Sequence, residues 1–221
     1  MLPENRLEDY LNTMAGRYPL LTAIREEVTK AYRALEECYR KGGKLLVAGN
    51  GGSACDAEHI VAELMKGFLS RRELNAEEEE RLVQIHREKG KVLAEKLQYA
   101  LPALALTSNF ALNTAFANDV DGRLCFAQQV YAYGEPGDVF LGITTSGNSE
   151  NVLYAAVAAK AKGMNIIGFT GKDGGEMGRL SDFMVRIPCV ETWAVQEAQI
   201  PVYHCWCRML AESFFGCNIG G

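Results

Sequence analysis

The stretch from Lys44 to Leu64 constrains the fold of this chain more than any other part of the sequence. It begins with a short apolar run, Leu45 to Ala48, which is preceded by glycine and is long enough for a buried strand. A turn of small residues follows at 49–53 (GNGGS), and a helical pattern begins directly after it. A strand that turns through glycines into a helix presents backbone N–H groups and the positive end of the helix dipole, which together suit an anion. The stretch therefore predicts either a phosphate-binding turn or, on the simpler interpretation, a tight turn with no ligand.

The helix expected after this turn carries an imidazole and a carboxylate on one face. His59 and Glu63 are four residues apart, so both side chains project from the same side of the helix. Such a pair can bind a metal ion or exchange protons with a substrate. The alternative is an ordinary glutamate on a partly buried helix.

Further apolar runs alternate with helical patterns along the rest of the chain. Strands without strict polar alternation, separated by helices, are typical of a parallel sheet that is covered on both faces. We therefore expect an α/β fold with a parallel five-stranded sheet in a three-layer sandwich of the flavodoxin or Rossmann type. The expected strands span 45–48, 102–107, 138–144, 164–170 and 183–188.

Two helical segments extend this core. Residues 5 to 41 carry apolar residues at spacings of three and four, with an interruption near Tyr18-Pro19, so 1–43 is expected to be a helical arm. Residues 71–100 are highly charged and are expected to be a helical insertion, capped by Asn75, with Gly90 as the point where a break would fall. With no linker and no internal repeat, we expect a single domain over residues 1–221.

Composition excludes several classes of protein. The net charge is −5 and there is no basic block, so nucleic acid and anionic membranes are poor partners. No apolar run approaches the ~18–20 residues of a membrane span, and the polar N-terminus is unlike a secretory signal. Seven cysteines, scattered through apolar segments, indicate reduced thiols in a cytoplasmic protein. Cys205 and Cys207 could bind a metal ion, but the sequence has no second cysteine pair to complete such a site. We therefore expect these two side chains to pack in the core.

The expected strand at 138–144 ends in a second turn rich in hydroxyl groups. Thr144, Ser146 and Ser149 stand at the entry to a helix, where they and the free amides can donate hydrogen bonds to a phosphate. A helix N-cap with extra serines is the simpler interpretation. Neither turn fits G-x-x-x-x-G-K-[ST] or G-x-G-x-x-G, so nucleoside triphosphates and dinucleotides are weak candidates. Two such turns at the carboxyl ends of parallel strands suit a smaller phosphorylated ligand.

These motifs together resemble the sugar isomerase (SIS) domain family and, within it, the phosphoheptose isomerases. The resemblance covers nearly the whole chain. Its residues are GNGGSACDAEH at 49–59 with Glu63, Asn118-Asp119, GDVFLGITTSGNS at 137–149, FTGKDGG at 169–175, Gln196-Glu197, and His204.

The resemblance implies an aldose–ketose isomerase of phosphosugars, most simply one that converts sedoheptulose 7-phosphate to D-glycero-D-manno-heptose 7-phosphate in heptose biosynthesis. It implies one zinc ion per site, held by residues matching His59, Glu63, Gln196 and His204, with Glu63 as base and His204 as acid. It also implies a cytoplasmic homotetramer with active sites between subunits. The implied substrate contacts are Asn50, Gly51, Gly52, Ser53, Asn118, Asp119, Thr144, Thr145, Ser146, Ser149 and Gln196.

Two alternatives stay open at this point. The chain departs from the family pattern at Ala54, Thr144, Trp193-Ala194 and Gln199, so it could be a SIS isomerase for a different phosphosugar. It could also be a non-catalytic scaffold of the same fold, like the relatives that associate with the bacterial replication initiator. Those relatives lack the acidic and imidazole pair, whereas this chain has Glu63 and His204.

Overall fold

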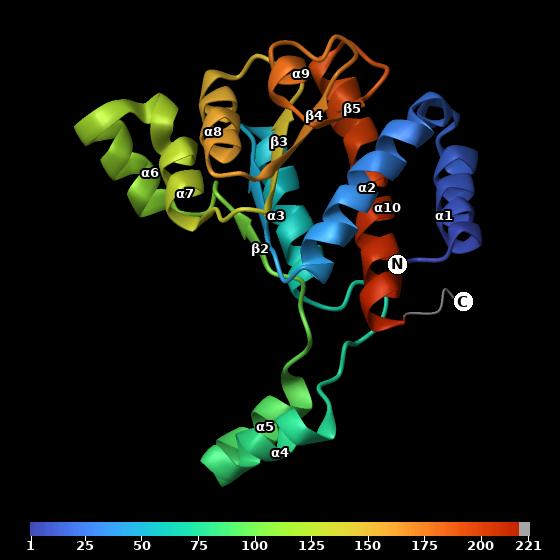
Figure 1. The fold of residues 1–221 in the computed structure, drawn as a ribbon, viewed down its shortest axis with the longest axis vertical. Helices are drawn as coiled ribbons and strands as arrows, with labels where there is room; N and C mark the ends of the chain where they lie inside the picture. The colour runs from blue at the N-terminus through green and yellow to red at the C-terminus, as the bar shows by residue number, and fades with distance from the viewer. Residues whose placement is uncertain (217–221) are drawn as a thin grey trace.

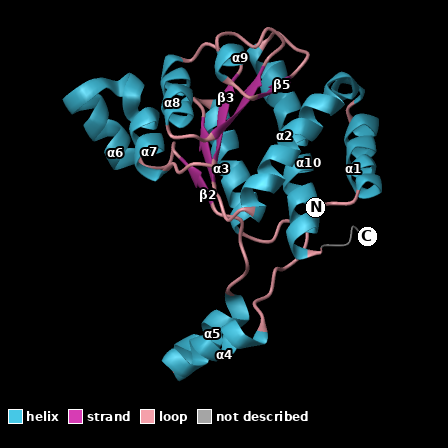
Figure 2. Ribbon diagram, viewed as in Figure 1, coloured by secondary structure: helices cyan, strands magenta, loops and turns pink. Residues whose placement is uncertain are grey.

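The centre of the protein is a parallel five-stranded sheet. In the computed structural model, which describes residues 1–216, the strand order is β2-β1-β3-β4-β5 and all four pairings are parallel. The predicted α/β class and sheet are confirmed (Figure 2). The strands are β1 (Leu45–Ala48), β2 (Ala103–Ala105), β3 (Val139–Thr144), β4 (Asn165–Thr170) and β5 (Phe183–Arg186).

Helices and helical turns connect these strands. The α-helices are α1 (Glu4–Arg17), α2 (Arg25–Arg40), α3 (Gly52–Met65), α4 (Ala76–Ile85), α5 (Arg87–Lys96), α6 (Phe110–Phe116), α7 (Cys125–Tyr133), α8 (Glu150–Ala161), α9 (Met177–Leu180) and α10 (Thr192–Phe215). The short helical turns are the 3₁₀ segments η1 (Pro19–Ile24) and η3 (Gly122–Leu124) and the π-helical turn η2 (Ala117–Asp121).

Alternating strand residues build one core on each face of the sheet. Leu45 and Val47 of β1 face α2, α3 and α10 in the larger core, which also takes in α1. Leu46 and Ala48 face the smaller core, which is built with α7, α8 and α9. Figure 1 shows these two helical layers on either side of the sheet, with α1 outermost. Burial on both faces explains why the strands are continuous apolar runs.

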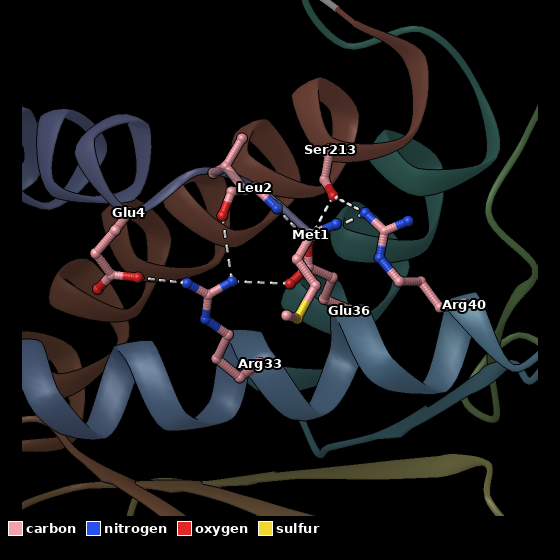
Figure 3. A network of polar contacts seen from close by, with 7 residues as sticks. All are labelled: Met1, Leu2, Glu4, Arg33, Glu36, Arg40 and Ser213. Carbon is pink, nitrogen blue, oxygen red and sulfur yellow. Dashed lines mark hydrogen bonds and ion pairs between the residues drawn. The ribbon is translucent and has the colours of Figure 1, made fainter.

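The N-terminal arm is fastened to the end of α10 by one buried carboxylate. Glu36 of α2 is 1% exposed, and its Oε1 accepts hydrogen bonds from the Leu2 amide and from Ser213 Oγ of α10, both at 2.6 Å. Arg33 donates to the other carboxylate oxygen at 3.0 Å, and Arg40 Nη2 lies 3.4 Å from Oε1 (Figure 3). Burial alone would raise the pKa of Glu36, but the hydrogen bonds lower it to about 2.

The charged insertion forms a hairpin of two helices that stands away from the sheet (Figure 1). Asn75 caps α4 as predicted, because its side chain accepts a hydrogen bond from the Glu78 amide at 2.9 Å. The break lies at His86, however, and Gly90 is inside α5. A Cβ at position 90 would lie 2.2 Å from the Leu82 carbonyl oxygen, so this glycine lets the two helices approach closely.

The base of the hairpin is attached to the end of α3. Arg72, 3% exposed, donates to the carbonyl oxygens of Leu64 at 2.7 Å and Glu63 at 3.3 Å. These bonds occupy carbonyls that the last turn of a helix leaves without partners. Gln98 Oε1 accepts from the amides of Gly67 and Arg72, which joins the two ends of the insertion.

The described cysteines are all free thiols. Cys38, Cys125, Cys205 and Cys207 are buried, Cys189 is half-buried and Cys55 is exposed, while Cys217 lies outside the described residues. Burial raises the pKa of Cys38 to about 11 and that of Cys205 to about 12, which keeps both protonated. Within residues 1–216, no helix is long and apolar enough to cross a membrane.

Candidate functional site

The two glycine- and hydroxyl-rich turns meet where the strand order reverses. The chain passes from β1 to β2 on one side and returns to β3 on the other, so the turns after β1 and β3 flank the switch point of the sheet. Ligands of open α/β sheets bind at this point, outside the carboxyl ends of the strands. Asn50 of the first turn and Asn151 of α8 exchange two hydrogen bonds of 2.8 Å, which join the turns directly.

The first turn is tight because its glycines admit close neighbours. Gly51 has φ of 55°, a left-handed conformation that favours glycine, and a Cβ at Gly49 would lie 2.5 Å from the Ser53 carbonyl oxygen. No side chain caps the start of α3, and the amides of Ser53 and Ala54 donate to the carbonyl oxygens of Asn50 and Gly51 at 3.0 Å within the turn. Ser53 is buried at this helix start.

The second turn is braced by the glycine segment that follows β4. Gly147 has φ of 72°, and a Cβ there would lie 2.1 Å from the Gly174 carbonyl oxygen. Asn148 Oδ1 accepts from the Glu176 amide at 2.9 Å, and Thr144 Oγ1 lies 2.9 Å from Ser149 Oγ. The FTGKDGG segment therefore supports the second turn. Thr145 is half-buried and Ser146 is exposed beside it.

A hollow of about 390 Å³ opens beside both turns and contains a cation that the sequence did not indicate. It is lined by Asn50, Gly122, Arg123, Ser149, Glu150 and Asn151. The Arg123 guanidinium pairs with Asp121 at 2.7 Å and lies 3.8 Å from Glu150. The hollow beside the turns therefore presents one guanidinium and one carboxylate.

Three predicted site residues from two helices meet at the other end of α3. His59 Nε2 lies 3.4 Å from Glu63 Oε1 and 3.4 Å from His204 Nε2 of α10. Among residues 1–216, Glu63 Oε2 is buried without a hydrogen-bond partner, and the nearest cation to it is Lys66 at 3.7 Å. Burial, and then the neighbouring His59, lowers the pKa of His204, so this imidazole is neutral at pH 7.

A buried tyrosine orients His59 from behind. The Tyr203 hydroxyl donates to Asp56 Oδ1 at 3.2 Å and lies 2.9 Å from His59 Nδ1. Burial, and then the Asp56 carboxylate, raises the pKa of Tyr203, so the hydroxyl keeps its proton. With that proton directed at Asp56, the oxygen can accept from Nδ1–H of His59; in that tautomer the Nε2 lone pair is available to a metal ion between Glu63 and His204. Sequence reasoning missed both Asp56 and Tyr203; the only signal was the spacing of Asp56, three residues before His59.

Gln196 lies beside the start of α3. A Cβ at Gly52 would lie 2.6 Å from the Gln196 amide nitrogen, so this side chain covers the first turn of α3. The helices α10 and α3 run in the same direction, because Gln196 lies beside Gly52 and, further along both helices, His204 lies beside His59. Within residues 1–216, no hydrogen bond joins Gln196 to His59, Glu63 or His204 in this conformation.

Asn118 and Asp119 lie on the π-helical turn η2. Both are exposed, and the Asn118 amide donates to Asp119 Oδ1 at 2.8 Å. π-helical turns are rare and occur frequently at functional sites. Of the departures from the family pattern, Trp193 is 64% exposed, whereas Gln199 is fully buried and donates to the Phe169 carbonyl.

The donor atoms of His59, Glu63 and His204 suit a zinc ion by their chemistry. Two imidazole nitrogens and a carboxylate with a buried, unpartnered oxygen form a mixed nitrogen and oxygen set of the kind that zinc takes. In the described part of the chain, however, no group of three or more His, Cys, Asp or Glu side chains is arranged as a ready metal site.

Comparisons with known proteins agree with this architecture. A model of the SIS domain family matches residues 9–79 and 85–171. The chain is 37% identical over 196 residues to the phosphoheptose isomerase of Aneurinibacillus thermoaerophilus, covering 89% of this chain and 84% of that protein. It is 38% identical over 191 residues to the phosphoheptose isomerase of Clostridium acetobutylicum, covering 86% and 84%.

Solved structures give the same result. The phosphoheptose isomerase of Neisseria gonorrhoeae superposes with a TM-score of 0.71 at 29% identity, over 96% of this chain and all of that one (100%). The phosphoheptose isomerase of Francisella tularensis gives 0.71 at 28% identity, over 96% and 100%.

Proposed function

The chain belongs to the SIS domain family, and from this we propose that it is a phosphosugar ketol-isomerase that interconverts sedoheptulose 7-phosphate and D-glycero-D-manno-heptose 7-phosphate. The observation that carries the proposal is the meeting of three side chains: His59 Nε2 lies 3.4 Å from Glu63 Oε1 and 3.4 Å from His204 Nε2. The first glycine turn opens the same helix, α3, that carries His59 and Glu63.

The spacing along α3 between the first turn and His59 suits the substrate. His59 is seven residues beyond Gly52 on α3, which places it about 10 Å along the helix axis from the first turn. This distance is comparable with the length of an extended heptose phosphate. The phosphate would bind at the turns, through Asn50, Gly51, Gly52 and Ser53 and through Thr144, Thr145, Ser146 and Ser149, and the sugar would lie along α3 past Gln196.

Isomerisation moves a proton between adjacent carbons, so it needs a base and an acid at the carbonyl end of the sugar. Glu63 is suited to be the base, because one of its carboxylate oxygens is buried with no hydrogen-bond partner. His204, a neutral imidazole beside it, can hold or donate a proton at the sugar oxygen. Asp119 and Asn118 are proposed to contact the substrate from η2.

A bound zinc ion would be held by His59, Glu63 and His204, with Gln196 as a fourth ligand after its side chain turns away from Gly52. The ion would supply Lewis-acid stabilisation of the developing oxyanion. We further propose a cytoplasmic homotetramer in which the cleft is completed by another subunit.

The test is turnover of sedoheptulose 7-phosphate by the unsubstituted chain and by Glu63→Gln. This change keeps the size of the side chain and an oxygen ligand but removes the proton acceptor. Turnover should fall by roughly 10²–10⁴, the usual contribution of a positioned acid or base. Binding of the phosphosugar should persist, because both turns are untouched.

His204→Asn should likewise abolish turnover while leaving the fold intact. If the unsubstituted chain isomerises no phosphoketose and both variants bind sugar phosphates and zinc as it does, the isomerase proposal is wrong. A non-catalytic scaffold would then be the better interpretation.

A further inference from the structure

A cavity of about 300 Å³ lies between α1, α10 and the segment that follows α3, and none of the residues that line it belongs to the two turns. Figure 1 shows α1 alongside α10, the two helices that form most of its wall. His204 is also part of the wall, and its ring lies 5.3 Å from that of Phe68. Along α10, His204 is eight residues beyond Gln196, which is about 12 Å. The cavity is therefore separate from the hollow at the turns.

The wall of this cavity carries positive charge and no carboxylate. Arg17 of α1 and Arg208 of α10 line it, whereas no Asp or Glu side chain does. Within residues 1–216, neither guanidinium has a hydrogen bond or an ion pair. Acidic residues outnumber basic ones in this chain, 28 to 23, so two unpaired arginines around one cavity require an explanation.

The carboxylate one turn beyond Arg208 on α10, Glu212, is already occupied. Arg6 donates to both of its oxygens, at 2.7 Å and 2.8 Å, and the Tyr10 hydroxyl donates to one of them at 2.7 Å. The Arg208 guanidinium carbon lies 5.0 Å from the centre of the Tyr10 ring, and its Nε is buried without a hydrogen-bond partner. A buried donor without an acceptor is costly, and an anion in the cavity would give this guanidinium acceptors.

Large apolar side chains surround the two arginines. Tyr18 and Leu69 are each 47% exposed and Ile200 is 39% exposed, and all three line the cavity. Phe68 is half-buried beside them. A ligand that satisfies this wall therefore has an anionic group for the guanidinium groups and an apolar part for the rings and aliphatic side chains.

We propose that this cavity is a second anion-binding site, which takes a phosphate monoester with a small apolar or aromatic body. A phosphate monoester carries about 1.5–2 negative charges at pH 7 and offers three acceptor oxygens, which suits two guanidinium groups. The turns present amides and hydroxyls instead, so the two sites recognise phosphate by different means. The second site does not depend on the proposed isomerase activity.

Calorimetric titration with phenyl phosphate tests the site. Binding to the unsubstituted chain should include one event that Arg17→Gln with Arg208→Gln removes, while any binding at the turns persists. Arg17→Gln alone changes an exposed side chain and should weaken the same event by about tenfold or more, the usual effect of losing a hydrogen bond to a charged group. If the isomerase proposal fails, the event at the cavity is still present, so the two failures are distinguishable.

The matched control is Arg87→Gln with Arg179→Gln. Both arginines lack an ion pair in the described part of the chain and lie outside the cavity, so phenyl phosphate should bind this variant as it binds the unsubstituted chain. Benzoate, which has the same ring but a single charge, should bind the cavity about tenfold more weakly or less.

Three results would overturn the proposal. The first is a titration in which Arg17→Gln, folded by circular dichroism, binds phenyl phosphate as the unsubstituted chain does. The second is benzoate binding as tight as that of phenyl phosphate. The third is a change in the mass of the particle, measured by light scattering, when the two cavity arginines are replaced, because a carboxylate of another chain would then be their partner.

Discussion

Tyr203→Phe removes one hydroxyl group and tests how the cleft is organised. Tyr203 is 1% exposed, and its hydroxyl links Asp56, which is 9% exposed, to His59 Nδ1. The substitution keeps the ring and its packing, so its effects report the hydrogen bonds alone.

The expected loss of stability follows from the two groups left behind. A hydrogen bond to a charged group contributes about 1.5–3 kcal/mol, and a buried carboxylate without its donor bears a desolvation cost of similar size. We expect the free energy of unfolding to fall by about 2 kcal/mol in urea titrations. Tyr39→Phe is the control, since that hydroxyl is buried without a hydrogen-bond partner and its loss should cost little.

The second expected effect is on the imidazole of His59. Without Tyr203 to accept from Nδ1–H, the ring is free to carry its proton on Nε2, the nitrogen that faces Glu63 and His204. Nitrogen NMR of the zinc-free protein distinguishes the two tautomers, and with only three histidines in the chain each signal can be assigned by single substitutions. Zinc affinity should fall about 10–100-fold, the usual cost of losing a group that orients a metal-binding histidine.

The reasoning is refuted if Tyr203→Phe keeps the Nδ1–H tautomer of His59 and binds zinc within about threefold of the unsubstituted chain. A loss of stability alone, with the tautomer and zinc affinity unchanged, would limit the role of the Tyr203 hydroxyl to its hydrogen bond with Asp56.

Three further results are expected. Glu36→Gln should lower the free energy of unfolding by roughly 3 kcal/mol, since it breaks a buried, hydrogen-bonded carboxylate. The pKa of Glu36 is lowered from 4.5 to about 2, so its contribution to stability is fully present above about pH 4.5 and is lost as the pH falls toward 2. Unfolding measured as a function of pH in acid would show this loss. Gly147→Ala should destabilise the protein by about 3 kcal/mol in thermal melts, because the new Cβ would lie 2.1 Å from the Gly174 carbonyl oxygen. Gly137→Ala is the control: this residue has φ of 89° but no close neighbour, so the substitution should cost only about 1 kcal/mol. Ser53→Ala and Ser146→Ala should each weaken phosphosugar binding by about 1–3 kcal/mol, measured by calorimetry, with little change in melting temperature.

The sheet could be predicted from the sequence because strands buried on both faces leave a local pattern. All five expected strands are present, and their ends differ from the predicted ones by no more than two residues. The hairpin shows where local pattern is insufficient. The sequence pattern predicts a break at Gly90, but in the structure this glycine permits close contact with Leu82, and the chain turns at His86 instead. A glycine that opens a turn and one that admits a neighbouring helix look the same in a sequence.

Sequence motifs could predict only those site residues that lie close together in the chain. His59 and Glu63 share one helix, so their spacing alone placed them together. The link between Tyr203 and His59 joins residues 144 positions apart, and no local pattern pairs them. Arg123 could not be predicted as a site residue either, since only the folded chain brings η3 beside the turn after β1. The single domain over residues 1–221 and the roles assigned to the site residues stay predictions.

The hydrogen bonds from Arg72 to the last carbonyls of α3 determine which residues of the insertion could be replaced without disturbing that helix. Arg72 belongs to the insertion by sequence, yet it completes the helix that carries Glu63, and Gln98 holds it in place from the other end. Residues 73–97 are thus a cassette that can be shortened, replaced or grafted with another helical pair. A cut one residue earlier would remove the guanidinium that finishes α3 and loosen the turn on which Glu63 stands.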